Sequence, residues 1–407
     1  MKKHFVLLFL MISVLQLNAQ WNVVYSDTTV DYMSDIKYFN EQLIAACGSN
    51  NFYDGRVWTS RDNGETWVMD TAGFRNNGIS VPSLSAIYSV GCDGSGIKSV
   101  DGGLSWQSLQ IVPLPTDDLT DVFFINDSLG FAYKYKILRT VDGGNSWSSQ
   151  FGFQLSDNSE SMDGAAERFC LGDDLLFFAS PGGIYSSPDS GLSWGPLQED
   201  SSLSLRSIFM FNDYEGFASS FTGSLLHTSD GWLTYEIRQI SDQGLHGVTF
   251  INDSVGLMGA GGFYGYGDGD TCGMILYTRD RGQNWFGERF SDKRICALSC
   301  HDSTCFAVSY DRKIFRCDNL ISYVNHVETI CNTSFQIYPN PVNNLLHLDF
   351  SDEGTISITI MDVKGEIVMR RNSNGSSLID MEQMPSGIYF ICIESEKLKT
   401  IKKVIKL

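Results

Sequence analysis

Ser99-Val100-Asp101-Gly102-Gly103-Leu104-Ser105-Trp106 is the stretch that decides the fold, because it recurs along most of the chain. The shared pattern is Ser or Thr, any residue, Asp, any residue, Gly, any residue, then Ser, Thr or Asn, then Trp. The aspartates of six copies stand 39, 41, 47, 41 and 50 residues apart. A weaker copy begins at Thr228, where Trp232 replaces the glycine and Tyr235 the tryptophan. The residues that carry the pattern are Asp62, Gly64, Trp67, Asp101, Gly103, Trp106, Asp142, Gly144, Trp147, Asp189, Gly191, Trp194, Asp230, Tyr235, Asp280, Gly282 and Trp285.

The chemistry of this octapeptide is structural. Its aspartate can accept backbone N–H groups within its own turn, and its glycine reaches positive φ at low cost. Its tryptophan is large enough to pack between neighbouring sheets. A decayed seventh copy ends near Asn319, 39 residues after Asp280, without the glycine and tryptophan.

A second repeat surrounds a polar turn. Val122–Ala132 resembles 208–218 and 248–258: an apolar segment, Asn-Asp, and a second segment that starts at glycine. These segments predict the two inner strands of a four-stranded unit, with the octapeptide joining the two outer strands. Residues 21–25 have strand character and are expected to close a ring by completing the last unit.

The octapeptides resemble the Asp-box, or BNR, repeat of sialidases, sortilin-type receptors and photosystem II assembly-factor-like propellers. That resemblance implies an all-β protein with an Asp-box β-propeller over residues 20–325, because about 40 residues suit one blade. We expect seven blades, or six if the decayed copy is not one. Sialidase activity is not expected, because the Arg-Ile-Pro motif of those enzymes is absent.

The end of the chain is a different module. After a linker at 326–336, alternating apolar residues and glycine turns predict a small antiparallel β-sandwich over 337–407. The order of its motifs resembles the type A C-terminal sorting domain of the type IX secretion system of Bacteroidota. The residues that carry this resemblance are Tyr338, Pro339, Asn340, Pro341, Gly365, Pro385, Gly387 and Tyr389. It implies the type IX machinery as a partner, and cleavage followed by release or surface attachment.

The first 19 residues predict that the chain is exported from the cytoplasm. Two lysines, an apolar run and a small residue at Ala19 are typical of a cleaved secretory signal peptide. Together with the sorting domain, this predicts a protein that is secreted or held at the outer cell surface, via the periplasm. Facing strands are expected to bring Cys300 and Cys305 close enough for a disulfide, the alternative being buried thiols.

Composition restricts the partners. The chain of 407 residues has a formal net charge of −19, so we expect no nucleic-acid partner. No transmembrane segment is expected after signal removal, and the motifs of a metal site or cofactor are missing from the sequence.

Two groups of residues are candidates for ligand binding, on the face opposite the octapeptides. Arg168, Arg206, His246 and Arg294 precede or enter inner strands of four consecutive blades, and are expected to suit an anionic group. The alternative is that the arginines pair with carboxylates of neighbouring loops. The second group is Tyr264, Tyr266, Asp268 and Asp270 in the loop 261–272, where aromatic and acidic residues suit a sugar.

The function predicted from these features is a non-catalytic propeller that binds an extracellular glycan or protein. No catalytic residue is assigned, and whether the chain is an enzyme stays open. The alternative is a glycan-active hydrolase, that is, a glycoside hydrolase, with carboxylates on the loops of the face opposite the octapeptides.

Overall fold

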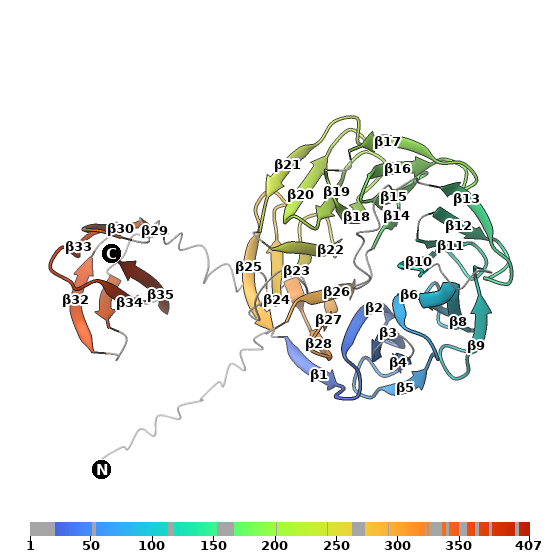
Figure 1. The fold of residues 1–407 in the computed structure, drawn as a ribbon, viewed down its shortest axis with the longest axis horizontal. Helices are drawn as coiled ribbons and strands as arrows, with labels where there is room; N and C mark the ends of the chain where they lie inside the picture. The colour runs from blue at the N-terminus through green and yellow to red at the C-terminus, as the bar shows by residue number, and fades with distance from the viewer. Residues whose placement is uncertain are drawn as a thin grey trace, which may run out of the picture. The chain divides into compact units, whose positions relative to one another are not determined.

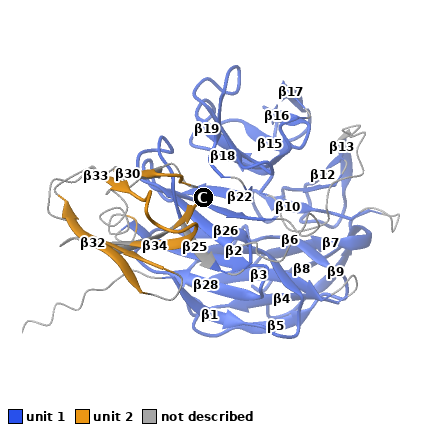
Figure 2. Cartoon of the chain, turned by 60° about the vertical axis from the view of Figure 1, so that its left-hand side comes forward, with its two compact units in different colours: residues 1–321 blue, residues 322–407 orange. Residues whose placement is uncertain are grey.

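The computed structural model describes residues 21–407 except 51–53, 113–117, 135, 153–166, 201, 242, 263–272, 292, 322–323, 325–335, 339–341, 350–355, 363–365, 374–376 and 395–398. The chain divides into two compact units, residues 1–321 and 322–407 (Figure 2). The predicted division placed the end of the propeller at 325, four residues later. No helix in the described part of the chain is long and apolar enough to cross a membrane.

The first unit is a β-propeller of seven four-stranded antiparallel sheets (Figure 1). Six sheets take their strands in chain order, so each is one local meander. The strands of these blades 1 to 6 are β2 (Tyr32–Asn40), β3 (Leu43–Asn50), β4 (Asp54–Ser60), β5 (Val68–Thr71); β6 (Asn76–Ser80), β7 (Ile87–Gly91), β8 (Ser95–Ser99), β9 (Gln107–Gln110); β10 (Asp121–Phe124), β11 (Gly130–Tyr133), β12 (Lys136–Thr140), β13 (Ser148–Gly152); β14 (Phe169–Leu171), β15 (Leu176–Ser180), β16 (Gly183–Ser187), β17 (Gly195–Glu199); β18 (Leu205–Met210), β19 (Gly216–Ser220), β20 (Ser224–Thr228), β21 (Glu236–Gln239); β22 (Gly244–Phe250), β23 (Gly256–Gly261), β24 (Gly273–Thr278) and β25 (Phe286–Ser291).

Blade 7 closes the ring. Its inner strands are β26 (Ile295–His301), β27 (Thr304–Ser309) and β28 (Lys313–Cys317), and its outer strand is β1 (Asn22–Ser26) from the start of the chain. Val23 is paired with Phe315, so the first and last segments of the propeller share one sheet. The seventh blade and its closure by residues 21–25 are therefore confirmed.

The octapeptides form one repeated hydrogen-bond network between the third and fourth strands of blades 1 to 6. In each, the Ser or Thr hydroxyl accepts the N–H group four residues on, at 2.7–2.9 Å. The aspartate accepts the N–H group four residues after itself, at 2.8–2.9 Å. The serine at the seventh position, Ser105, Ser146 or Ser193, also donates its hydroxyl proton to the aspartate. This bond first, and the backbone N–H bond second, hold the pKa of Asp101, Asp142 and Asp189 down to about 2.

Aromatic side chains of the octapeptides fill the space between blades. Trp67 contacts the cluster of blades 1 and 7, and Trp147 that of blades 2 and 3. Trp194 lies between blades 3 and 4, and Trp285 between blades 5 and 6. We call each of these tryptophans, inserted between two neighbouring blades, an aromatic wedge. The wedges stabilise the ring at several places, rather than one central core doing so.

The fifth octapeptide fills the space between two blades with a tryptophan at a different position. Trp232 stands at the glycine position with φ of 69° and is fully buried. Its indole N–H contacts the Met210 sulfur at 3.2 Å, within the cluster of blades 4 and 5. The aromatic wedge has moved three positions earlier, and the smaller Tyr235 packs beside it.

The second unit contains a three-stranded and a four-stranded antiparallel sheet. Its strands are β29 (Gln336–Tyr338), β30 (Leu345–Asp349), β31 (Ile356–Met361), β32 (Ile367–Ser373), β33 (Ser377–Asp380), β34 (Gly387–Glu394) and β35 (Lys399–Lys406). Leu346, Ile358, Ile379 and Ile391 from both sheets share one buried cluster, as a sandwich requires. Of the sorting motif, Tyr389 is buried and donates its hydroxyl proton to the Pro385 carbonyl at 2.8 Å. Pro339, Asn340, Pro341 and Gly365 lie outside the described residues.

Candidate functional site around the propeller axis

The two faces of the propeller carry different segments. One face holds the octapeptides and the turns between first and second strands, and we call it the box face. The other holds the blade-to-blade connections and the turns between second and third strands, and we call it the connection face. Each innermost strand begins at the connection face, so residues at its start lie next to the propeller axis.

The predicted basic residues lie at these starts. Arg206 is in β18 and His246 in β22, while Arg168 and Arg294 directly precede β14 and β26. All four are buried, with side chains at most 8% exposed. They come from blades 4 to 7 as predicted, but as buried groups rather than as an open ring.

The arginines pack on aromatic rings. The Arg294 guanidinium lies 4.7 Å from the ring centre of Tyr310, and that of Arg206 lies 5.7 Å from Phe221. Arg168 lies 5.4 Å from the Tyr133 ring and donates to the Leu205 carbonyl at 3.3 Å. Aromatic faces stabilise a buried cation while leaving its in-plane N–H groups directed elsewhere.

Arg206, His246 and Arg294 form one electrostatic unit, which we call the basic cluster. Burial holds the pKa of His246 well below its ordinary value, and the charges of Arg206 and Arg294 lower it further. The imidazole is therefore neutral at neutral pH, with one ring nitrogen 3.4 Å from the Gly261 carbonyl. Arg206 and Arg294 thus place two positive charges around His246, in a chain whose net charge is −19.

The other predicted group cannot be placed. Tyr264, Tyr266, Asp268 and Asp270 lie outside the described residues, as does most of the loop 151–166.

A second charged group near the axis was missed by sequence reasoning. Lys37 of blade 1 lies 2.9 Å from the Asp35 carboxylate and 3.1 Å from that of Glu167, which precedes blade 4. Lys37 thereby links two segments 130 residues apart. Burial by itself would lower the pKa of Lys37, but the charges of Asp35 and Glu167 together outweigh it and raise the pKa. An available signal was the acid–aliphatic pair Asp35-Ile36, repeated as Asp121-Val122, in the first half of two innermost strands.

Asp35 and Asp121 bind backbone rather than a ligand. Each accepts the N–H group of the next residue in its own strand and an N–H group of the following blade. For Asp121 these donors are Val122 at 2.8 Å and Arg168 at 3.0 Å; for Asp35 they are Ile36 at 2.7 Å and Ile79 at 3.0 Å. Burial raises the pKa of Asp121 to about 7 in spite of these bonds. Both carboxylates therefore join neighbouring blades, and neither has the freedom of a catalytic acid.

A hollow of about 380 Å³ lies on the box face between blades 1 and 7. It is lined by the two inner turns of these blades, with Glu41 and Gln42 on one side and His301 and Asp302 on the other. In the part of the chain that the structure describes, no three His, Cys, Asp or Glu residues are grouped so as to hold a metal ion.

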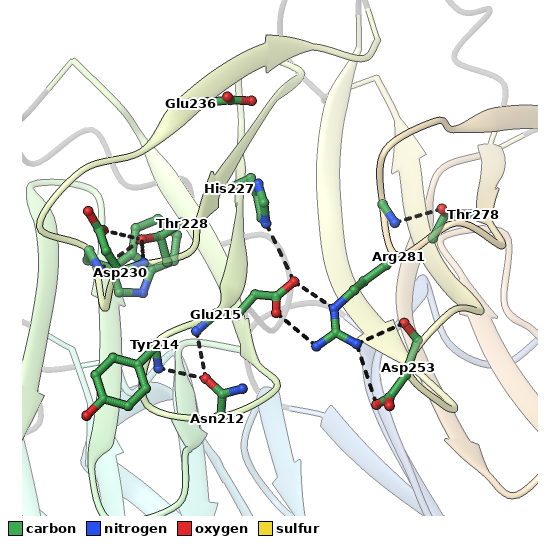
Figure 3. A network of polar contacts seen from close by, with 12 residues as sticks. Asn212, Tyr214, Glu215, His227, Thr228, Asp230, Glu236, Asp253, Thr278 and Arg281 are labelled. Carbon is green, nitrogen blue, oxygen red and sulfur yellow. Dashed lines mark hydrogen bonds and ion pairs between the residues drawn. The ribbon is translucent and has the colours of Figure 1, made fainter.

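An ion-pair network joins blades 5 and 6 on the box face (Figure 3). Arg281 of the sixth octapeptide donates two parallel hydrogen bonds to Glu215, at 2.6 and 2.9 Å, and lies 4.1 Å from the Phe211 ring centre. His227 lies 3.9 Å from the same carboxylate, and the pKa of this histidine is lowered by burial first. Arg281 lowers the pKa of Glu215, so the carboxylate stays ionised.

We expect Arg281→Met to lower the free energy of unfolding by about 1–2 kcal/mol, because it removes a bidentate pair between blades. The comparison variant is Arg238→Met, which removes an ion pair with Glu236, a residue 68% exposed, and a hydrogen bond to the Gln283 carbonyl at 3.1 Å. It should cost less than about 1 kcal/mol, because its charged partner is exposed. Urea unfolding at low salt measures both. Equal losses for the two variants would show that the Arg281 pair is an ordinary surface pair.

Comparisons with known proteins agree with this architecture. Residues 336–407 match the family described as secretion system C-terminal sorting domain. Among solved structures, YCF48 bound to D1 peptide has a TM-score of 0.55 at 16% identity, over 73% of this chain and 96% of the other. YCF48 from Cyanidioschyzon merolae gives 0.55 and 16%, over 74% and 99%. The WD40 β-propeller domain of Doa1 gives 0.54 and 10%, over 75% and 99%. No curated protein matches the sequence.

These matches define the class of protein. The chain is a β-propeller followed by a sorting domain of the type IX kind, which marks it for export toward the outer surface or the medium. At 10–16% identity, the structural neighbours establish the fold alone.

Proposed function

We propose that this chain is a non-catalytic binding protein that acts outside the cell, after passage through the periplasm. Its partner is a protein that presents an anionic group, such as an acidic segment or a terminal carboxylate, to the basic cluster. The predicted signal peptide brings the chain to the periplasm, and the sorting domain carries it outward.

The observation that carries this proposal is the basic cluster itself. Arg206, His246 and Arg294 stand at, one before and two before the β-bulge at the start of the innermost strand in three consecutive blades. The charges of the two arginines act on His246. Charges buried in a medium of low dielectric constant attract an anion more strongly than surface charges do. The excess of acidic residues elsewhere on the chain makes this place a selective one for a negative group.

A protein partner is preferred to a glycan for two reasons. YCF48, which shares the fold, is described as bound to a peptide, so a propeller of this form can hold one. Among the described residues, the rings of Phe221 and Tyr310 at the basic cluster each lie under a guanidinium group, of Arg206 and Arg294, so part of their surface is already covered.

The test uses the full mature chain on two arrays, one of peptides with acidic segments and free or amidated C-termini, the other of sulfated and uronic-acid glycans. A panel of chromogenic glycosides runs beside them. We expect peptide binding that falls at least tenfold in Arg206→Gln and Arg294→Gln and persists in Arg238→Gln, with melting curves as the control for folding. Binding to glycans alone, or turnover of a glycoside, would contradict the proposal.

A further inference from the structure

Three cysteines stand in one row across blade 7. In the antiparallel register, Cys300 of β26 is directly opposite Cys305 of β27, which is directly opposite Cys317 of β28. Partners directly opposite each other in a sheet project their side chains to the same face. Cys300 and Cys305 form a disulfide, as the sequence predicted, and Cys317 is a thiol outside it.

The geometry places Cys317 within disulfide distance of Cys305. The Cα atoms of Cys300 and Cys305 are 4.1 Å apart, which is the spacing of a non-hydrogen-bonded pair. The backbone groups of Cys305 then face the other neighbour, so Cys305 and Cys317 are a hydrogen-bonded pair with Cα atoms ~5.5 Å apart. That spacing lies within the range of about 4.4–6.8 Å that disulfides span.

The cysteine row differs from the equivalent row of residues in each of the other six blades. The position of Cys317 is the first position of the octapeptide, occupied elsewhere by a serine or threonine whose hydroxyl donates to the box aspartate. The residue opposite it is Ile44, Ile87, Gly130, Leu176, Gly216 or Gly256 in blades 1 to 6. In blade 7 the box has lost its aspartate, and the hydroxyl has become a thiol beside a disulfide.

We propose that Cys300, Cys305 and Cys317 form a thiol–disulfide exchange site in which the disulfide moves between two positions. The Cys317 thiolate attacks the Cys305 sulfur, the Cys305–Cys317 bond forms, and the Cys300–Cys305 bond breaks. The electron pair leaves on Cys300, which takes up the proton that Cys317 gave to solvent, so no oxidant or reductant is consumed.

The two states differ in what they expose. Cys305 and Cys317 are fully buried, whereas Cys300 is partly exposed and immediately precedes His301 of the hollow between blades 1 and 7. Exchange therefore converts a buried thiol into an accessible one at the box face. The class of reactant that such a site takes is another thiol or disulfide, in an oxidising compartment where exported proteins fold.

Peptide mapping under non-reducing conditions tests the proposal. Trypsin places Cys296, Cys300 and Cys305 in one fragment, 295–312, and Cys317 with Cys331 in the next long one, 317–364. A Cys305–Cys317 link therefore joins two peptides, and sequencing of the linked pair by mass spectrometry assigns the two cysteines. In Cys300→Ser, we expect this inter-peptide link to replace the original disulfide. Recovery of Cys305 and Cys317 as two alkylated thiols, or of either joined to another cysteine, would overturn the proposal.

The wild-type chain supplies a measurement that does not depend on the folding of a variant. On incubation of the native protein with iodoacetamide, alkylation of Cys300 should rise with time as the Cys305–Cys317 link accumulates. In Cys317→Ser the original disulfide should persist, and Cys300 alkylation should be lost. Alkylation at Cys317 with none at Cys300 would show that the disulfide does not move.

Discussion

Replacing Trp232 with alanine should lower the free energy of unfolding by about 3–5 kcal/mol, the largest loss we expect from one side chain of the propeller. The indole is fully buried between blades 4 and 5, among Ile208, Ala218 and Leu226. Its removal leaves a cavity that the strands cannot close, because they are fixed by their own ladders. Denaturant unfolding monitored by circular dichroism measures the loss.

Trp232→Gly separates the cavity from the backbone strain. Trp232 has φ of 69°, a conformation that costs a residue with a Cβ roughly 1–2 kcal/mol and glycine little. The glycine variant should therefore be more stable than the alanine variant by about 1 kcal/mol, the reverse of the usual order. Trp147→Ala, at a partly buried wedge, should cost less than Trp232→Ala. A loss below about 1 kcal/mol for Trp232→Ala would contradict this account of the fifth octapeptide.

The stability of the propeller should depend on pH through Asp121. Its pKa is about 7 in the folded chain and roughly 3.9 when unfolded, so between these values the folded state binds the extra proton. This contribution to stability is fully present below about pH 4 and is lost as pH rises to 7. At about 1.4 kcal/mol per pH unit, the loss amounts to a few kcal/mol.

Asp121→Asn isolates this effect, because asparagine does not titrate. Near pH 4 the variant should be less stable than the wild type, since its amide nitrogen cannot accept the second of two backbone N–H groups. Between pH 4 and 8 the difference should shift by a few kcal/mol in favour of the variant. Unfolding free energies at both pH values measure it, with Asp127→Asn, at an exposed turn of the same blade, as control. A difference that does not change with pH would contradict a raised pKa at Asp121.

The propeller was predictable because its determinants are local and repeated. The octapeptide satisfies its own hydrogen bonds within eight residues, so six copies gave the position of every hairpin between outer strands. The ring closure followed from the one apolar segment left over at the start, 21–25. The shift of the wedge to Trp232 was visible as a departure from the pattern, but its backbone conformation was not.

The axial region was harder to predict, because it depends on which residues of distant blades meet. Lys37 and Glu167 are 130 residues apart in the sequence, and no local pattern links them. The basic residues were placed correctly at the starts of inner strands, yet their burial and their stacking on Tyr133, Phe221 and Tyr310 depend on the register of each β-bulge. The cysteine row likewise became visible only through the pairing of three strands.

We expect the C-terminal unit to carry the propeller out of the cell, and one localisation measurement tests this most directly. The full chain and a chain lacking 336–407 are expressed in cells with a type IX secretion system. Medium, protease-accessible surface protein and periplasm are then quantified. We predict full-length protein in the medium or on the surface, and the truncated chain in the periplasm with an unchanged propeller melting temperature. Equal appearance of both chains outside the cell would contradict the claim.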